Sequence, residues 1–148
     1  MYRVFIDRQD FPSNNLDAVW RRIIVMAVFG NHLKMHLPHG LRDRAREFYA
    51  GVLGCKALEA QPYPDLDLYE FDGGAVVGLF FCDDKDVLAV SDYEKATWLE
   101  IKVADPDGTR KQLETFGVEV VDFAAKTRFY FKAPGGQVYR LAPLDGEL

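Results

Sequence analysis

The sequence predicts an α+β protein in which a strand–helix–strand–strand–strand unit occurs twice after an N-terminal extension. Apolar and polar residues alternate in two stretches, 31–37 and 97–103, as they do in half-buried strands. A helical pattern that ends at a glycine follows each stretch. Each half then has a Gly-Gly pair between two stretches of strand character, which is typical of a hairpin turn.

The first 29 residues differ from the rest of the chain and form the predicted extension. Tyr2–Ile6 has the pattern of a short strand, and Asn14 is suited to cap a helix. Apolar residues recur at helical spacing over about residues 15–28, which predicts a helix there. As an alternative, Met26 is the natural start of the protein and residues 1–25 are upstream sequence.

The first repeated unit spans about residues 30–82 and begins with the strand at 31–37. A turn at 38–40 follows. Apolar residues at helical spacing then predict a helix over 41–52 that ends at Gly54. Three further strands are expected near residues 56–61, 66–71 and 75–81.

A polar, acidic connector at 83–95 leads to the second unit, which spans about residues 96–143. Its strand at 97–103 precedes a helix over about 105–116, which opens with Asp-Pro and ends at Gly117. Three strands are again expected, near residues 118–123, 127–132 and 137–142.

The two units match at nearly constant spacing. Leu33 aligns with Leu99 at an offset of 66 residues, and Gly74 aligns with Gly136 at an offset of 62. The drift between these offsets corresponds to a few residues of loop length, as a duplicated unit would show. We therefore interpret the chain as an internal duplication.

Composition and charge narrow the function classes. The 148 residues include 18 Lys and Arg against 23 Asp and Glu, so no basic nucleic-acid footprint is expected. The longest apolar run, Ile23–Phe29, is too short to cross a membrane, which takes about 20 residues. The two cysteines, Cys55 and Cys82, lack zinc-site spacing and fit a reducing compartment, so we predict a cytoplasmic protein.

Short motifs in both units carry a resemblance to a known superfamily. The motifs are Asn31-His32-Leu33, residues 38–41, 45–49 and 52–54 in the first unit, and residues 95–96, 116–120, 128–130 and Pro134 with Gly136 in the second. In this order and spacing, about residues 30–143 resemble the vicinal oxygen chelate superfamily of glyoxalase, bleomycin-resistance and ring-cleaving dioxygenase proteins.

The resemblance implies that each βαβββ unit, called a module below, curls its four strands around a cavity with its helix outside. Residues 30–148 would then form a single domain with a curved, barrel-like mixed sheet. The resemblance also implies a homodimer and, in metal-dependent members, one divalent ion. That ion is held by a His or Gln on the first strand of each module and a Glu near the end of each last strand.

The positions that match these metal ligands hold other residue types. His32 stands at the first-strand position of module one, and its counterpart is Trp98, or Thr97 in a second alignment. Gly78 and Arg140 stand at the last-strand positions. Because the ligand set is mostly lost and Arg140 would add a cation, we predict no metal and no other cofactor.

Strand alternation indicates which side chains replace the metal ligands in the cavity. The predicted ligand-binding residues are His32, Lys34, His36, Gly78, Phe80, Trp98, Glu100 and Arg140. In one interpretation these charges satisfy one another, with Glu100 paired to Lys34, Lys102 or Arg140. In the other they form a pocket with an aromatic wall, where Arg140 binds an anionic group of a ligand.

Three functions remain open at this point. The first is a metal-free protein that binds a small apolar-aromatic or anionic molecule between the modules. The second is a metal-independent lyase or isomerase, with His32 or Glu100 as general base and Arg140 as anion stabiliser. The third is a structural or regulatory module whose cavity is filled. The sequence leaves open whether the protein is an enzyme.

Overall fold

The computed structural model describes residues 29–59, 63–122 and 128–145. The chain divides into two units, Met1–Gly30 and Asn31–Leu148, and the fold below is that of the second unit. The strand at Tyr2–Ile6 and the helix at 15–28, which the sequence predicts, lie outside the described residues.

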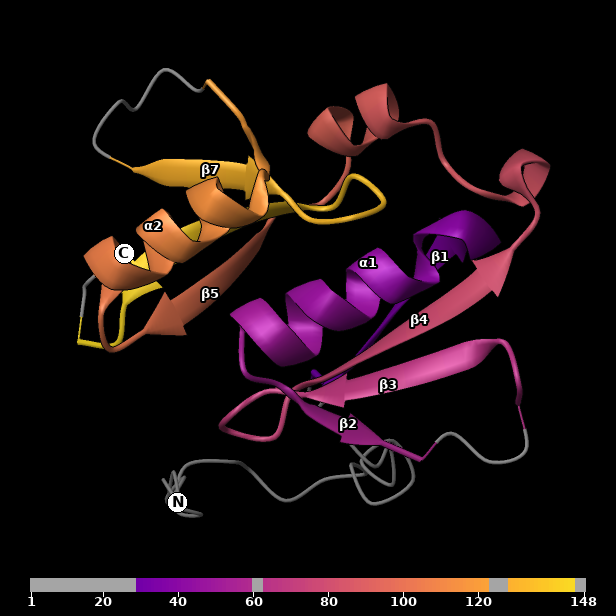
Figure 1. The fold of residues 1–148 in the computed structure, drawn as a ribbon, viewed down its shortest axis with the longest axis horizontal. Helices are drawn as coiled ribbons and strands as arrows, with labels where there is room; N and C mark the ends of the chain where they lie inside the picture. Colours follow the sequence, from indigo (N-terminus) through magenta and orange to yellow (C-terminus); the bar gives the residue numbers. More distant parts are fainter. Residues whose placement is uncertain (1–28, 60–62, 123–127, 146–148) are drawn as a thin grey trace, which may run out of the picture. The chain divides into compact units, whose positions relative to one another are not determined.

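Module one has the predicted order of one strand, one helix and three strands. Its elements are β1 (His32–Pro38), the short helix η1 (His39–Leu41), α1 (Arg42–Arg46), the π-helical turn η2 (Glu47–Val52), β2 (Lys56–Leu58), β3 (Leu66–Glu70) and β4 (Val76–Cys82). The strands form a sheet in the order β1-β4-β3-β2, in which only β1 and β4 are parallel. The helix lies across one face of this sheet (Figure 1).

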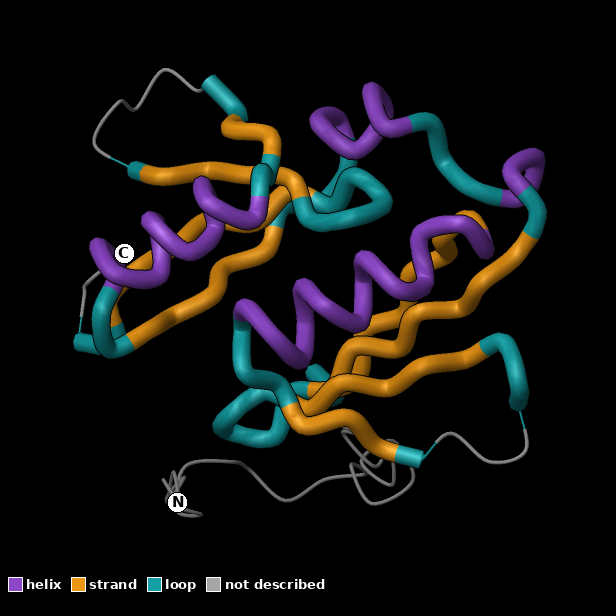
Figure 2. Tube along the Cα trace, viewed as in Figure 1, coloured by secondary structure: helices purple, strands orange, loops and turns teal. Residues whose placement is uncertain are grey.

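The connector contains two short 3-10 helices, η3 (Asp84–Asp86) and η4 (Val90–Lys95), which are drawn among the purple helices in Figure 2. Module two then repeats the order of module one. Its elements are β5 (Leu99–Val103), α2 (Pro106–Phe116), β6 (Glu119–Val120), β7 (Phe129–Lys132) and β8 (Val138–Pro143). Their sheet has the equivalent order β5-β8-β7-β6.

The strand register confirms the internal duplication. In module one, Lys34 lies opposite Gly78, and in module two Glu100 lies opposite Arg140. These pairs are related by the same offsets, 66 and 62 residues, that the sequence shows. Residues at equivalent positions of the two modules therefore occupy equivalent places in the two sheets.

Local signals explain where α2 begins and ends. The Asp105 carboxylate accepts a hydrogen bond from the backbone N–H of Gly108 at 3.0 Å, and Pro106 occupies the first turn. Gly117 ends the helix with a left-handed φ of 83°, and its N–H donates to the carbonyls of Leu113 and Glu114. Both features agree with the helix that the sequence predicts.

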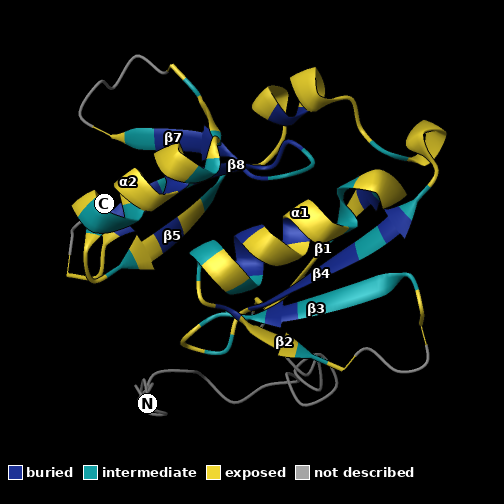
Figure 3. Cartoon of the chain, viewed as in Figure 1, coloured by how far each residue is buried: buried dark blue, intermediate teal, exposed yellow. Residues whose placement is uncertain are grey.

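The core lies between each helix and its sheet, where Figure 3 shows the buried residues gathered. Fully buried side chains come from both modules and include Leu37, Phe48, Tyr49, Leu79, Phe81, Leu113 and Phe131. The two modules also touch directly, since the Tyr49 and Tyr139 hydroxyls hydrogen bond at 3.1 Å inside this core. Residues of both modules thus share one hydrophobic core.

The sequence predicts a curved, barrel-like sheet. In the structure its strands form two four-stranded sheets, one in each module. β1 and β5, the first strands of the two modules, each lie at the edge of their own sheet. Within the described ranges no strand pairs with the outer edge of either one. These two open edges position the cavities described below.

Candidate functional site

The structure divides the predicted site residues between the two sheets. His32, Lys34 and His36 on β1 share the sheet face that points away from α1 with Gly78 and Phe80 on β4. The other three residues, Trp98, Glu100 and Arg140, belong to module two, where Glu100 and Arg140 lie opposite each other across β5 and β8.

The exposed Lys34 and His36 side chains lie beside the half-buried Phe80 ring. The Lys34 ammonium lies 4.8 Å from the centroid of the Phe80 ring, and the His36 ring lies 5.7 Å from it. Above Gly78, an added Cβ would come within 3.3 Å of Leu68, so leucine side chains already fill that space. His32 is exposed, and its Nδ1 lies 2.9 Å from the Asn31 amide oxygen.

Two of the three module two residues, Glu100 and Arg140, form an ion pair. Arg140 Nη2 donates to Glu100 Oε2 at 2.9 Å, and Lys102 Nζ lies 3.9 Å from Glu100 Oε1. The Arg140 side chain is only 16 % exposed, and its Nε is buried without a hydrogen bond to any described residue. Of the two interpretations of the sequence, this geometry matches the one in which Glu100 satisfies Arg140.

A cavity of about 560 Å³ runs along the open edge of β1. Of the eight predicted residues, only Lys34 and His36 line it. The connector supplies much of its wall, and module two adds Thr97 and Gln137. The other lining residues are Met35, Lys85, Asp86, Val87, Leu88, Tyr93 and Ala96. The cavity therefore lies where β1, the connector and module two meet, and we call it the β1 cavity.

The β1 cavity combines positive groups with unpaired strand backbone. Two lysines, Lys34 and Lys85, line it together with the His36 ring and one carboxylate, Asp86. The parallel register directs the backbone N–H and C=O of Lys34 and His36 away from β4 and toward the open edge. The Tyr93 hydroxyl donates to the His36 carbonyl at 3.4 Å, which confirms this direction. Such an edge can bind the polar groups of a ligand.

A buried lysine fixes the connector that walls the cavity. Lys132 is only 7 % exposed, and its Nζ lies 2.6 Å from Glu94 in η4 and 2.7 Å from Glu119 in β6. Hydrogen bonds to Glu119 and Glu94 raise the pKa of the Lys132 ammonium, which remains charged. Tyr93 packs on the adjacent Gly136, where an added Cβ would lie 2.7 Å from its ring.

Sequence reasoning missed these residues because the connector lacks strand or helix periodicity. Tyr93 is the one aromatic side chain in the polar stretch 83–95, and that isolated ring was the available signal. Gln137 gives no such signal. Its amide donates to the carbonyls of Thr97 and Val138, and this fixes the side chain at the end of the cavity.

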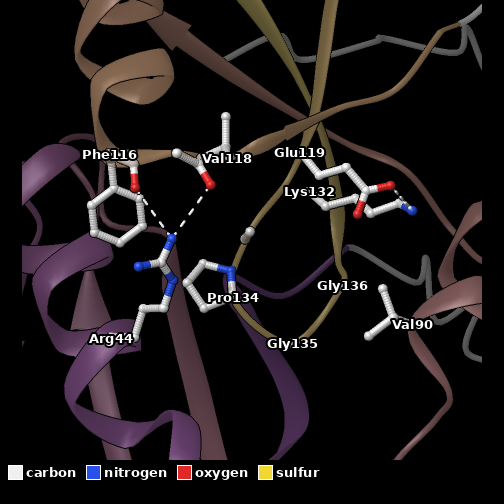
Figure 4. A pocket seen from close by; sticks show the side chains of 11 residues that line it. Arg44, Val90, Phe116, Val118, Glu119, Lys132, Pro134, Gly135 and Gly136 are labelled. Carbon is white, nitrogen blue, oxygen red and sulfur yellow. Dashed lines mark hydrogen bonds and ion pairs between the residues drawn. The ribbon is translucent and has the colours of Figure 1, made fainter.

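A smaller cavity of about 160 Å³ lies at the end of α2 (Figure 4). Arg44 of module one donates to the carbonyls of Phe116 and Gly117, at 3.2 and 3.4 Å, and lies over the Phe116 ring. A cation at this position stabilises the negative end of a helix. Because Arg44 already binds the helix end and the volume is below that of usual ligand sites, we assign this contact a structural role.

No family model matches the sequence, and no curated protein matches it. Solved structures do match. A trypanothione-dependent glyoxalase I of Leishmania major has 18 % identity and a TM-score of 0.62, over 79 % of this chain and 87 % of that one. The fosfomycin resistance protein FosX of Mesorhizobium loti has 13 % identity and a TM-score of 0.60, over 83 % and 95 %. The antibiotic binding protein TnmS3 of Streptomyces sp. CB03234 has 19 % identity and a TM-score of 0.54, over 80 % and 98 %.

The described residues have the vicinal oxygen chelate fold. The resemblance stated from the short motifs is thus confirmed at the level of fold. In the part of the chain that the structure describes, no helix is long and apolar enough to cross a membrane.

The divalent ion of metal-dependent vicinal oxygen chelate proteins does not fit the residues at the matching positions. Gly78 offers no side chain, and Arg140 brings a guanidinium whose neighbour Glu100 is already engaged. Among the described residues, no group of three His, Cys, Asp or Glu side chains is placed to hold a metal. We therefore derive no step through a metal at these positions.

Proposed function

We propose that this protein binds a small anionic molecule with an apolar or aromatic part, and that the ligand occupies the β1 cavity. The main observation that supports this proposal is the size of the β1 cavity. Its volume of about 560 Å³ falls within the usual range of ligand sites, about 300–1,000 Å³. A structural module with a filled cavity is disfavoured by this volume.

The lining residues favour an anionic ligand. The two lysines Lys34 and Lys85 outnumber the single carboxylate Asp86 in the lining, so a carboxylate, sulfonate or phosphate gains favourable contacts at this wall. The Lys85 Nζ lies 3.8 Å from Asp83 Oδ2, so this lysine already has a partner on the surface. Lys34 is therefore the main anchor for the negative group of the ligand. Val87 and Leu88 provide an apolar wall for the remainder of the ligand.

One neighbour of the same fold supports binding as the activity, since it is named as an antibiotic binding protein. The lyase or isomerase alternative gains no support from the geometry, since His32 and Arg140 belong to different sheets and both Glu100 oxygens face cations. We assign the Glu100–Arg140 pair a structural role and Lys34 and His36 the ligand contacts.

The proposal extends to a cytoplasmic homodimer with residues 1–29 as an extension outside the domain. The cysteines Cys55 and Cys82 are both free, which fits a reducing compartment. Light scattering after gel filtration will measure the mass in solution, and about twice the chain mass of 16.8 kDa is expected. A mass equal to a single chain would contradict the dimer.

A pair of matched fluorescent probes tests the binding function. Anilinonaphthalene sulfonate carries an aromatic body and one negative charge, and phenylnaphthylamine is its neutral analogue. We expect the sulfonate to bind more tightly, and Lys34→Met to weaken it about tenfold by removing a charge-assisted contact. Lys56→Met, at an exposed lysine outside the cavity, is the control and leaves the affinity unchanged. Equal affinities of the two lysine variants would contradict the proposed site.

A further inference from the structure

A second cavity lies along the open edge of β5, as the β1 cavity lies along β1. Its volume is about 310 Å³, and Ile101, Lys102 and Val103 of β5 line it. Module one contributes Phe71 and Asp72, which directly precede its Gly-Gly turn. We call this the β5 cavity.

The internal duplication makes the two cavities equivalent. The offset of 66 residues relates Met35 and His36 of the β1 cavity to Ile101 and Lys102 of the β5 cavity. Each cavity also includes a residue beside the Gly-Gly turn of the opposite module. Each cavity is also lined by a residue that follows the last strand of its own module. This residue is Leu88 in the β1 cavity and Leu144 in the β5 cavity. The same architecture thus presents two hollows of this kind in one chain.

The lining of the β5 cavity differs in charge from that of the β1 cavity. One lysine, Lys102, and one carboxylate, Asp72, line the β5 cavity, whereas two lysines and one carboxylate line the β1 cavity. Burial raises the pKa of the Cys55 thiol to about 12, so this lining group remains neutral at ordinary pH. The remaining side chains are mainly apolar, namely Val52, Leu53, Phe71, Ile101, Val103 and Leu144.

The β5 cavity offers hydrogen-bond acceptors beside the donor Lys102. The Asp72 carboxylate accepts only, and the Thr109 hydroxyl can also accept. The parallel register directs the backbone of Lys102 toward the open edge. A compact, uncharged aromatic ring with one N–H or O–H donor matches this combination of charge balance, apolar walls and acceptors.

We propose that the β5 cavity is a second ligand site, which takes a small neutral aromatic molecule with one hydrogen-bond donor. This site goes beyond the proposed function, because it differs from the β1 cavity in place, in size and in ligand charge. A single chain would then hold two different ligands at duplicated positions.

Indole titration followed by amide resonances of the full-length protein tests this site. We expect saturable shifts of the Lys102, Val103 and Leu144 amides. Shifts confined to Lys34 and His36, or shifts that do not saturate, would overturn the inference.

Two exposed leucines provide matched variants that fill one cavity each. Leu144 is 56 % exposed and Leu88 is 54 % exposed, so Trp at either position is compatible with folding. We expect Leu144→Trp to abolish indole binding and leave anilinonaphthalene sulfonate unaffected, and Leu88→Trp to do the reverse. Indole binding that survives Leu144→Trp overturns the second site. Sulfonate binding that survives Leu88→Trp would instead contradict the proposed function and leave the second site untouched.

Discussion

Replacing Arg140 distinguishes an ion pair from a ligand anchor. Arg140 and Glu100 are 16 % and 24 % exposed and hydrogen bond at 2.9 Å. Arg140→Met removes the guanidinium and leaves the Glu100 carboxylate three-quarters covered, with the Lys102 ammonium 3.9 Å away. The free energy of unfolding should fall by about 1–3 kcal/mol, which is the cost of a buried polar group without its partner.

Urea unfolding of the single and double variants measures the pair. Glu100→Gln alone should also destabilise, and the double variant with Arg140→Met should cost about 1–2 kcal/mol less than the sum of the single changes. Affinity for anilinonaphthalene sulfonate should remain unchanged, because neither residue lines the β1 cavity. If Arg140→Met lowered that affinity and left the stability intact, Arg140 would be a ligand anchor and our assignment would be wrong.

Two further pairs of substitutions test the core and the turn that supports the cavity wall. Tyr49→Phe and Tyr139→Phe should each cost about 1 kcal/mol of unfolding free energy, and the double change should cost less than the sum, since it leaves no orphaned hydroxyl. Strict additivity would refute a direct hydrogen bond. Burial raises the pKa of both hydroxyls, so the folded state holds their protons more tightly. Stability should therefore be full below the unfolded pKa of about 10 and fall as pH rises above it, less so in the double variant. Gly136→Ala should lower the melting temperature more than Gly73→Ala, because both have positive φ but only Gly136 faces a clash, with Tyr93. Equal losses would show that backbone strain alone matters.

The sequence was informative about the fold because its signals are local. The helix α2 begins at Asp105 and ends at Gly117 as predicted, since a cap and a left-handed glycine act within one turn. β2 begins at Lys56 as predicted and ends at Leu58, and the predicted end near residue 61 falls outside the described ranges. β2 is an edge strand with one partner, and the alternation of its residues carries no information about where that partner ends.

The candidate site was only partly predictable from the sequence. Alternation placed Glu100 and Arg140 on one face, and the structure pairs them. It also placed His32 with Lys34, but only Lys34 reaches the β1 cavity. The alternation of residues along a strand indicates which side chains share a face of that strand. It does not indicate how far they lie from side chains on another sheet. The cavity wall also depends on Tyr93, which lies in a connector without periodicity.

A crystal structure of the protein with bound anilinonaphthalene sulfonate tests the central claim most directly. We predict that the probe lies between the open edge of β1 and the connector, with its sulfonate beside the Lys34 ammonium and its rings against Val87 and Leu88. A probe bound instead on the module two sheet beside Arg140, or an empty β1 cavity at saturating probe, would contradict the account.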